Sequence, residues 1–325
     1  MKIGLFSDGL PDLSFTEFLD WSVQQGIGAV EIGTGGFSGA THCDLDGLLA
    51  AEGARQEFTG AIESRGLKLS ALNINSNPLD PDAARGKRDS EALCKTIELA
   101  GRIGLGTVVT MSGCPGDPSG GAYPNWVTHP WQLEFHDLYD WQWQEVVTPF
   151  WKKVGSYAAE RGVNVAIEMH PGQMVYNTTT MLRLREIGGA NIGANFDPSH
   201  LFYQGMDPLR VIGALGEDFI FHVHAKDTRV DPHEMALNGV VDMRSFENLA
   251  ERTWAYRTLG FGHDARWWKE FVSALRQVGY DGVLSIEHED LLMSAEEGIV
   301  KSVEFLRPIA ITTQPETEPS WFKRE

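Results

Sequence analysis

The chain has 325 residues, of which 42% are hydrophobic and 22% are charged, a composition typical of a globular protein and unlike that of a disordered or fibrous one. Asp and Glu total 45 against 27 Lys and Arg, and the resulting net charge of -18 disfavours binding to the phosphate backbone of nucleic acid. The sequence has no apolar run of membrane-spanning length, and its three cysteines lack paired spacing, so we expect a cytoplasmic protein with reduced thiols.

Eight apolar runs alternate with helical patterns along the chain. Capping patterns mark several helix starts: Ser14 with Glu17 and Ser294 with Glu297 form capping-box pairs, and Asp264 reads as a single cap. The predicted strands span residues 2–7, 29–37, 67–80, 106–113, 164–172, 192–200, 219–229 and 281–287. The predicted helices span residues 14–26, 43–66, 88–104, 143–162, 177–189 (capped at Asn177), 207–216, 262–279 and 294–310.

This alternation predicts an α/β fold, a single (β/α)8 TIM barrel over residues 1–312. A doubly wound sheet would need a glycine-rich phosphate turn after the first strand, and the segment SDGLPDL is not that fingerprint. Residues 313–325, which contain three acidic residues and two prolines, are predicted to be a C-terminal tail.

Two long loops are expected after the fourth and seventh strands, over residues 114–143 and 230–261. The first is rich in Pro and Gly and then dense in Trp and Tyr. Long structureless loops in compact domains tend to be functional. Its aromatic side chains are compatible with a substrate pocket, with a subunit interface in an oligomer, or with a lid on the barrel rim.

The last four strands each end in acidic or imidazole side chains, in the segments EMHPG, NFDPSH, HVHAKD and SIEHED. In a barrel the C-terminal ends of the strands meet on one face, which is where active sites of this fold lie. Glu168, Asp197, His224 and Glu287 should therefore converge. His222 lies on the same strand face as His224, one pleat deeper, and is the alternative imidazole ligand.

Three carboxylates and one imidazole form an oxygen-rich site that suits Mn2+, Mg2+, Co2+ or ferrous iron better than a structural zinc. Without a cation the carboxylates would repel one another and take up protons. We therefore predict a divalent metal cofactor, with Mn2+ as first choice and Mg2+ or Co2+ as alternatives. A single carboxylate at a strand end is commonly a cap or an ion-pair partner, and the prediction depends on four consecutive strands ending alike.

These four segments, in this order, resemble the xylose-isomerase-like barrel superfamily, the sugar phosphate isomerase/epimerase group. In its ketose 3-epimerase branch a Glu, Asp, His, Glu set binds the metal, and the four residues named above match it one for one. The resemblance implies that Glu168 and Glu287 act as the acid/base pair and that His200 contacts substrate. It also suggests a substrate-binding Arg, for which Arg229 lies one residue closer than the family pattern.

Such a site suits proton abstraction next to a carbonyl, with the metal stabilising an enediolate. Lys226 either adds positive charge near that oxygen and binds substrate, or forms an ion pair with Asp227. Return of the proton to the other face gives an epimer, and return to the neighbouring carbon gives an isomer. Expulsion of a substituent beta to the ketone makes the enzyme a lyase.

The segments NWVTHPW, DLYDWQW and RTLGFGHDARWW resemble the branch that includes the catalytic alpha subunits of C-glycoside deglycosidases, which act on 3-oxo-glycosides together with a smaller beta subunit. A Trp-rich pocket would suit a flat aglycone better than a small free sugar. The resemblance makes His129, His136 and His170 candidates for the acid/base, with His136 and Trp126 also as substrate contacts. A lyase of this kind is our first hypothesis, and a sugar phosphate isomerase or ketose 3-epimerase is the alternative.

Other classes fit less well. A DNA-repair endonuclease of this fold would need additional His ligands and a less acidic surface. A non-catalytic scaffold should have lost at least one of the four ligands, and xylose isomerase itself would need a second metal site. Cys114 as a thiol nucleophile lacks a His in a partner position.

Overall fold

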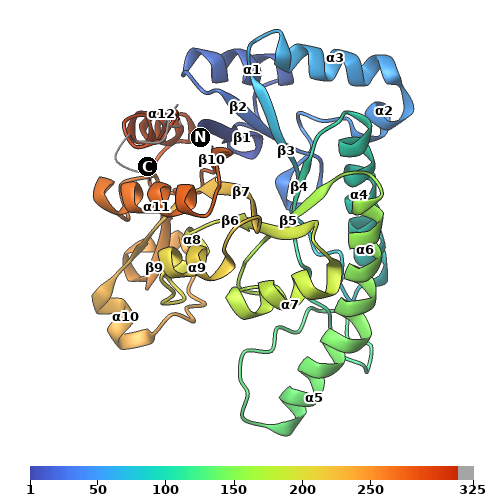
Figure 1. Ribbon diagram of the computed structural model, residues 1–325. Helices are drawn as coiled ribbons and strands as arrows, with labels where there is room; N and C mark the ends of the chain where they lie inside the picture. The colour runs from blue at the N-terminus through green and yellow to red at the C-terminus, as the bar shows by residue number, and fades with distance from the viewer. Residues whose placement is uncertain (314–325) are drawn as a thin grey trace, which may run out of the picture.

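The computed structural model describes residues 1–313, in which eight parallel strands close into a barrel surrounded by helices (Figure 1). Around the barrel the strands follow the order β1-β10-β7-β6-β5-β4-β3-β2, which confirms the predicted (β/α)8 architecture. Residues 314–325, which make up nearly all of the predicted tail, lie outside the described part of the chain. The barrel strands are β1 (Lys2–Phe6), β2 (Ala29–Gly33), β3 (Lys68–Ile74), β4 (Thr107–Met111), β5 (Asn164–Glu168), β6 (Ile192–Phe196), β7 (Ile220–Ala225) and β10 (Val283–Ile286).

The barrel interior changes from apolar to polar along the strands. Ala71, Val109 and Ala166 form a small buried apolar cluster. Side chains two residues apart share a strand face. Asn73 and Glu168 are each two residues after a member of that cluster, and both are buried. The C-terminal layers of the barrel are therefore lined by polar groups that need partners or ligands.

Helices cover the outside of the barrel, and three predicted caps are present. Ser14 and Glu17 form both halves of a capping box on α1, while Asn177 and Asp264 cap α7 and α11. None of the helices within residues 1–313 is both long and apolar enough to cross a membrane. The helices that follow the barrel strands are α1 (Phe15–Gln24), α3 (Glu52–Glu63), α4 (Ala83–Arg102), α6 (Thr148–Ala159), α7 (Thr178–Gly188), α9 (Pro208–Leu215), α11 (Ala265–Gln277) and α12 (Ala295–Leu306).

Two predicted helical features differ in the structure. The single helix expected over residues 43–66 is two helices, α2 (Leu45–Ala50) and α3, because Ala51 between them has extended backbone angles. At the start of α12 the Ser294 hydroxyl accepts a hydrogen bond from the amide of Glu297. The reciprocal bond is not formed, since the Glu297 carboxylate lies beside Lys301 instead, so only half of that capping box is present.

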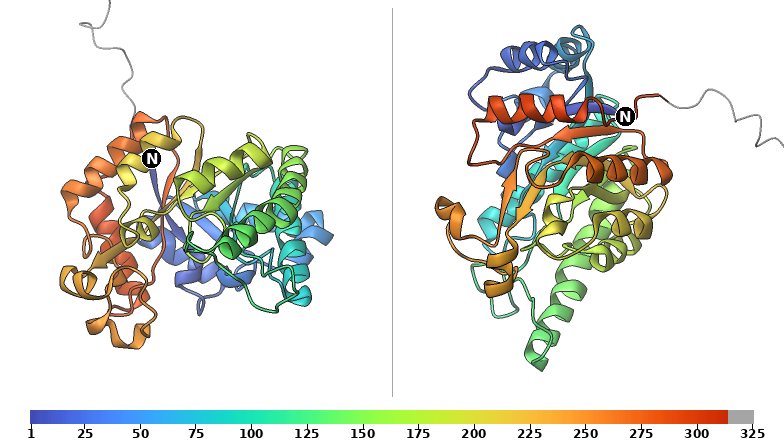
Figure 2. Two further views of the ribbon diagram at one scale, coloured as in Figure 1. Left: turned by 90° about the horizontal axis from the view of Figure 1, so that it is seen from below. Right: turned by 90° about the vertical axis from the view of Figure 1, so that its left-hand side faces the viewer.

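The first insertion, predicted to be a loop, ends in a helix. α5 (Leu133–Trp141) continues through a π-helical segment, η3 (Gln142–Val147), directly into α6, because this stretch lacks the Pro and Gly of the preceding residues. Trp143 is fully buried where the helical run reaches the barrel, whereas Trp131, just before α5, is 81% exposed. α5 projects beyond the ring of helices in two perpendicular views (Figures 1 and 2).

The second insertion, also predicted to be a loop, contains an antiparallel ribbon. Its elements are β8 (Asp227–Val230), α10 (Pro232–Asn238), η4 (Phe246–Glu251) and β9 (Trp254–Arg257), and β8 pairs with β9. The Asp227 carboxylate anchors the ribbon, because it accepts hydrogen bonds from the amides of Gly260, Gly262 and His263 at 2.9 to 3.1 Å. The ribbon is therefore held close to the barrel mouth.

Close helix packing makes Gly155 a position where Ala should destabilise the fold. A Cβ atom at Gly155 in α6 would lie 2.0 Å from the carbonyl oxygen of Gly188 in α7. Gly→Ala within a helix ordinarily stabilises by roughly 0.5–1 kcal/mol, but overpacking costs about 1–3 kcal/mol. We expect Gly155→Ala to lower the free energy of unfolding, measured by urea denaturation. Gly60→Ala in α3, where nothing lies within 4 Å of the added Cβ, should raise it. Equal changes in both variants would contradict this reading of the helix contact.

Candidate functional site

Four side chains from consecutive barrel strands converge at the C-terminal mouth of the barrel. Glu168 ends β5, His224 lies in β7, and Asp197 and Glu287 directly follow β6 and β10. One ligand atom from each of the four lies within 4.8 Å of the other three, and all four residues are buried. The structure thus brings together the four residues that the sequence analysis selected as metal ligands.

Three atoms of this set are buried without a hydrogen-bond partner: Asp197 Oδ2, His224 Nδ1 and Glu287 Oε2. His224 Nδ1 lies 3.0 Å from Glu287 Oε2 and 3.3 Å from Glu168 Oε2, so these atoms point at a shared centre. Buried polar atoms are rarely left unpaired, and an unpaired one in a native protein calls for an explanation. Oxygen and imidazole donors facing one point fit a divalent cation, which would supply the missing partner of each.

A buried lysine lies against the same carboxylates. Lys226 is 2% exposed, and its Nζ is 2.7 Å from Glu287 Oε2, 3.2 Å from Asp197 Oδ2 and 2.8 Å from Glu289 Oε2. Burial alone would lower the pKa of Lys226, but the attraction of these carboxylates outweighs it and raises the pKa well above its usual value. Lys226 therefore pairs with carboxylates of the candidate site, and the alternative ion pair with Asp227 is not formed.

The two glutamates of the set have different surroundings. Glu168 Oε2 accepts hydrogen bonds from Asn75 Nδ2 at 3.0 Å and from Asn195 Nδ2 at 3.1 Å, and its Oε1 lies 3.0 Å from His200 Nε2. Glu287 Oε2 instead lies 2.7 Å from Lys226 Nζ and 3.0 Å from His224 Nδ1. Glu168 is therefore held in place by two amides and a histidine, whereas Glu287 faces the lysine and His224.

His200 is surrounded by groups that favour its charged form. Its Nε2 lies 3.1 Å from Asp197 Oδ2, and its Nδ1 lies 3.0 Å from the hydroxyl of Tyr256 on β9. Burial lowers the pKa of His200, but the Asp197 carboxylate more than compensates and the pKa rises to about 9. The neighbouring His170 ring, 4.2 Å away between centroids, has its pKa lowered to about 4 by burial and then by the charge of His200.

A cavity of about 110 Å³ opens onto these groups. It is lined by Glu168, Glu287, His170, His200 and Lys226 from the sequence-predicted set, together with Asp8, Phe37 and Tyr256, which the sequence analysis did not select. Asp8 has a buried oxygen without a hydrogen bond, and its pKa is raised by burial and by the charges of Glu287 and Glu289. A carboxylate directly after the first strand follows the pattern of the last four strands, so that pattern could have identified Asp8.

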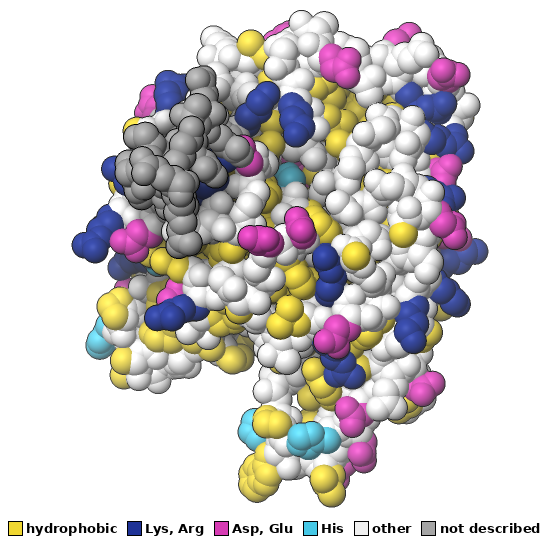
Figure 3. Space-filling view, viewed as in Figure 1, with side chains coloured by type: hydrophobic (Ala, Val, Ile, Leu, Met, Phe, Trp, Pro, Cys, Tyr) yellow, Lys and Arg dark blue, Asp and Glu magenta, His cyan; other side chains and the backbone are white. Residues whose placement is uncertain are grey.

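Apart from Asp197 and His224, which belong to the buried ligand set, four predicted site residues do not line this cavity. Trp126 packs edge-on against Tyr176. His129 lies in the exposed segment before α5, and His136 is an exposed residue of α5 whose Nε2 contacts the carbonyl of Pro130. The side chain of Arg229 is 58% exposed and pairs with Asp231. Figure 3 shows apolar and histidine side chains gathered at the tip of the α5 projection, away from the barrel.

Two alternative residues are also placed away from the candidate ligands' common centre. His222 lies deeper in the barrel, where its Nδ1 is 3.1 Å from Asn195 Oδ1. Cys114 is buried, and burial raises the pKa of its thiol to about 12. A thiol with that pKa stays protonated at neutral pH, which argues against the nucleophile hypothesis.

Comparison with known proteins gives a consistent result. Residues 19–309 match the family model described as xylose isomerase-like TIM barrel. The chain is 41% identical over 310 residues to the uncharacterized protein YfiH of Bacillus subtilis (strain 168), covering 94% of this chain and 98% of that one. It is 27% identical over 158 residues to inosose dehydratase of Geobacillus thermodenitrificans (strain NG80-2), covering 48% of this chain and 51% of that one.

Solved structures support the same fold. The crystal structure of the IOLI protein with a bound zinc atom has a TM-score of 0.64 at 17% identity, covering 95% of this chain and 98% of that chain. A D-tagatose 3-epimerase-like protein has a TM-score of 0.62 at 19% identity, covering 95% of this chain and 98% of that chain. At these identities the likeness concerns the fold.

Proposed function

The chain belongs to the xylose isomerase-like TIM barrel family, whose members include sugar-modifying enzymes, and we propose that it is a divalent-metal-dependent lyase acting on a keto-sugar or keto-cyclitol. The observation that carries the proposal is the convergence of four buried ligand side chains, paired with a buried lysine, at a cavity in the barrel mouth. Glu168, Asp197, His224 and Glu287 would hold the metal, with Mn2+ proposed first because oxygen ligands predominate.

When bound, a divalent cation would stabilise the negative charge that develops on the substrate's carbonyl oxygen. Glu287, which lines the cavity and whose pKa is raised by burial, takes the proton from the carbon next to the carbonyl. Glu168 is engaged by three donors and serves to hold geometry. The electron pair of the broken C–H bond moves toward the carbonyl, and Lys226 adds positive charge to this region.

Elimination is favoured by the acids that line the cavity. As the carbonyl re-forms, the bond to the beta substituent breaks, and the departing oxygen takes a proton from Lys226 or His200, whose pKa values are both raised by neighbouring carboxylates. Partial similarity to inosose dehydratase also supports an elimination on a cyclitol-like substrate.

Two other outcomes have support. Two carboxylates, Glu168 and Glu287, at one metal would suit a ketose 3-epimerase, in which one removes a proton and the other returns it. A C-glycoside deglycosidase, our first hypothesis from the sequence, is the third candidate. Its aromatic segment lies outside the cavity, so an aromatic aglycone would have to contact that segment beyond the cavity rim, and a beta subunit would belong to this candidate alone.

A panel of three substrates tests these proposals. Metal-loaded protein is incubated with a keto-cyclitol (an inosose), a free ketohexose and a 3-oxo-glycoside of a phenol, and products are separated by chromatography. We expect dehydration of the keto-cyclitol. An epimer from the ketohexose would instead establish the isomerase, and free phenol from the glycoside would establish the deglycosidase. No reaction with any of the three would contradict the proposed chemistry.

Removal of the metal should abolish activity and lower stability. Chelation leaves three carboxylates facing one another in a buried site, and any ligand that binds only the folded state stabilises it, by about 2.7 kcal/mol at 100 times its Kd. We expect dialysis against a chelator to lower Tm by several degrees and to reduce turnover to background. Addition of Mn2+ should restore both. Full activity after complete removal of divalent ions, verified by elemental analysis, would contradict the metal assignment.

A further inference from the structure

A second layer of polar side chains lies beneath the candidate metal ligands, and we call it the inner polar layer. It consists of five residues, one from each of five barrel strands, and none of them lines the cavity. Each is at most 2% exposed, so substrate does not reach them. The members are Glu31 on β2, Asn73 on β3, Asn195 on β6, His222 on β7 and Ser285 on β10.

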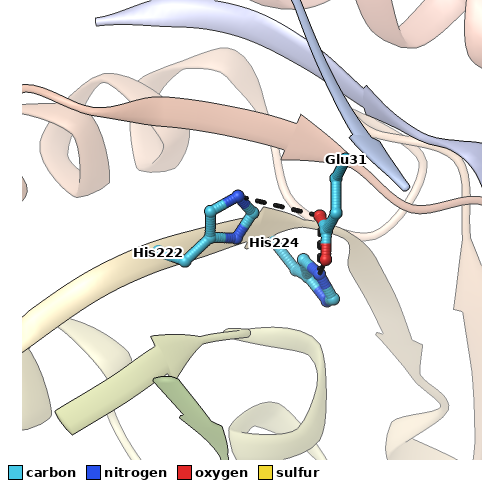
Figure 4. A group of neighbouring side chains, drawn as sticks. All are labelled: Glu31, His222 and His224. Atoms are coloured by element: carbon cyan, nitrogen blue, oxygen red, sulfur yellow. Dashed lines mark hydrogen bonds and ion pairs between the residues drawn. The ribbon is translucent and has the colours of Figure 1, made fainter. Parts of the chain in front are cut away.

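Glu31 is the centre of this layer, and it contacts the ring edge of His224 opposite the candidate metal position. Both of its carboxylate oxygens lie 3.1 Å from His224 Nε2. Figure 4 shows Glu31 between the rings of His222 and His224. The carboxylate cannot turn away, because Asn73 Nδ2 donates to Oε1 and Ser285 Oγ donates to Oε2, each at 2.7 Å.

We infer that Glu31 is a positioning residue that keeps the proton of His224 on Nε2 and so leaves the Nδ1 lone pair free to bind the metal. A neutral imidazole has one N–H donor and one acceptor nitrogen, and a carboxylate only accepts. The nitrogen that faces Glu31 must therefore be the donor. The other nitrogen, Nδ1, is the unpartnered atom that points at Glu168 and Glu287. A hydrogen bond on the far nitrogen of a ligating histidine orients the ring and raises its basicity.

The inner polar layer also orients a second candidate metal ligand, Glu168. Asn195 donates from Nδ2 to Glu168 Oε2 at 3.1 Å, which directs its carbonyl oxygen toward His222 Nδ1, also at 3.1 Å. Two of the four ligands are thus oriented from below by groups that contact neither solvent nor substrate. This inference rests on the proposed function only in that His224 must be a metal ligand.

An alternative occupant of the inner polar layer is a second cation held by Glu31, His222 and His224, whose donor atoms also lie within 4.8 Å of one another. A cation there would need unprotonated Nε2 atoms on both histidines. It would also compete with the Asn73 and Ser285 donors already bound to Glu31. The positioning role of Glu31 is compatible with all of these hydrogen bonds. It predicts one metal ion per chain, whereas a second cation site predicts two.

The test measures metal binding rather than turnover, so it is independent of the substrate. Co2+ affinity and the visible absorption spectrum of bound Co2+ are compared for the wild type, Glu31→Gln and Ser285→Ala, with affinity taken from competition with a chromophoric chelator. We expect one Co2+ per chain in all three. Glu31→Gln should bind about 10–100-fold more weakly, with an altered spectrum, as is found when such outer partners are removed. Ser285→Ala should bind Co2+ more weakly than the wild type, by a smaller factor than Glu31→Gln. It replaces Glu31→Gln as the test variant if Glu31→Gln does not fold.

The matched control is Asp89→Asn, which changes a buried carboxylate on α4 that accepts from the amide of Asn77. Its Co2+ affinity should equal that of the wild type. Unchanged affinity and spectrum in both Glu31→Gln and Ser285→Ala would overturn the positioning role. Two Co2+ ions per wild-type chain, one of them lost in Glu31→Gln, would overturn it in favour of a second metal site. A wild type that binds Co2+ but turns over none of the three substrates would contradict the proposed function alone.

Discussion

Replacement of Glu287 by Gln is expected to abolish turnover while leaving the fold intact. The substitution removes one negatively charged candidate ligand and the acceptor oxygen that we propose takes the substrate proton. Loss of a general base alone typically costs 10²–10⁴-fold, so we expect kcat to fall by about 10³-fold or more. The stability of the metal-free protein should not fall, because burial disfavours this carboxylate's charge and raises the pKa of Glu287. Steady-state kinetics and thermal unfolding measure the two effects.

The control for this variant is Glu289→Gln. The Glu289 side chain is 45% exposed and contacts the same lysine at 2.8 Å, but it is not among the four grouped ligands. We expect its turnover to stay within about tenfold of the wild type, because it changes the electrostatics of the cavity without removing a ligand or the base. Substantial activity in Glu287→Gln would contradict the site assignment, and equal losses in both variants would show that net charge alone matters.

The four candidate ligands could be found from the sequence because a barrel gathers its strand ends in one place. Buried parallel strands are almost wholly apolar, so a carboxylate or imidazole at the end of a run such as IGANFD is informative. The same reasoning applies to Asp8, two residues after β1, and to Glu31 in β2.

The rest of the site depends on long-range contacts that local patterns do not encode. Tyr256 reaches His200 only because β8 and β9 pair and Asp227 anchors the loop after them. The partners of Lys226 come from β6 and β10, so sequence proximity to Asp227 was misleading. Composition likewise could not show that the aromatic segment of residues 114–143 turns into a helix that leads away from the cavity.

Replacement of Lys226 by Met is expected to change metal affinity and turnover in opposite directions. The ammonium lies within 3.2 Å of two candidate ligands, so it competes with a cation for the same carboxylates. Two unit charges about 4 Å apart interact with roughly 4 kcal/mol near a protein surface, so removal of this charge should tighten divalent-metal binding by at least about tenfold. Met keeps the length and the apolar stem of the side chain, so the surrounding packing is preserved.

Turnover in the same variant should fall, because a positive charge near the developing oxyanion is lost and such a donor is typically worth about 10²–10³-fold in kcat. Metal affinity is measured in Mn2+ buffers and kcat at saturating Mn2+, so that the two effects separate. Lys95→Met is the control, since that lysine is 47% exposed and pairs with Asp46 on the surface, and neither quantity should change. Weaker metal binding in Lys226→Met would show that the lysine supports the carboxylate geometry instead of competing for it. Tighter binding with unchanged kcat would place the reacting carbonyl away from the ammonium and leave His200 as the acid at the leaving group.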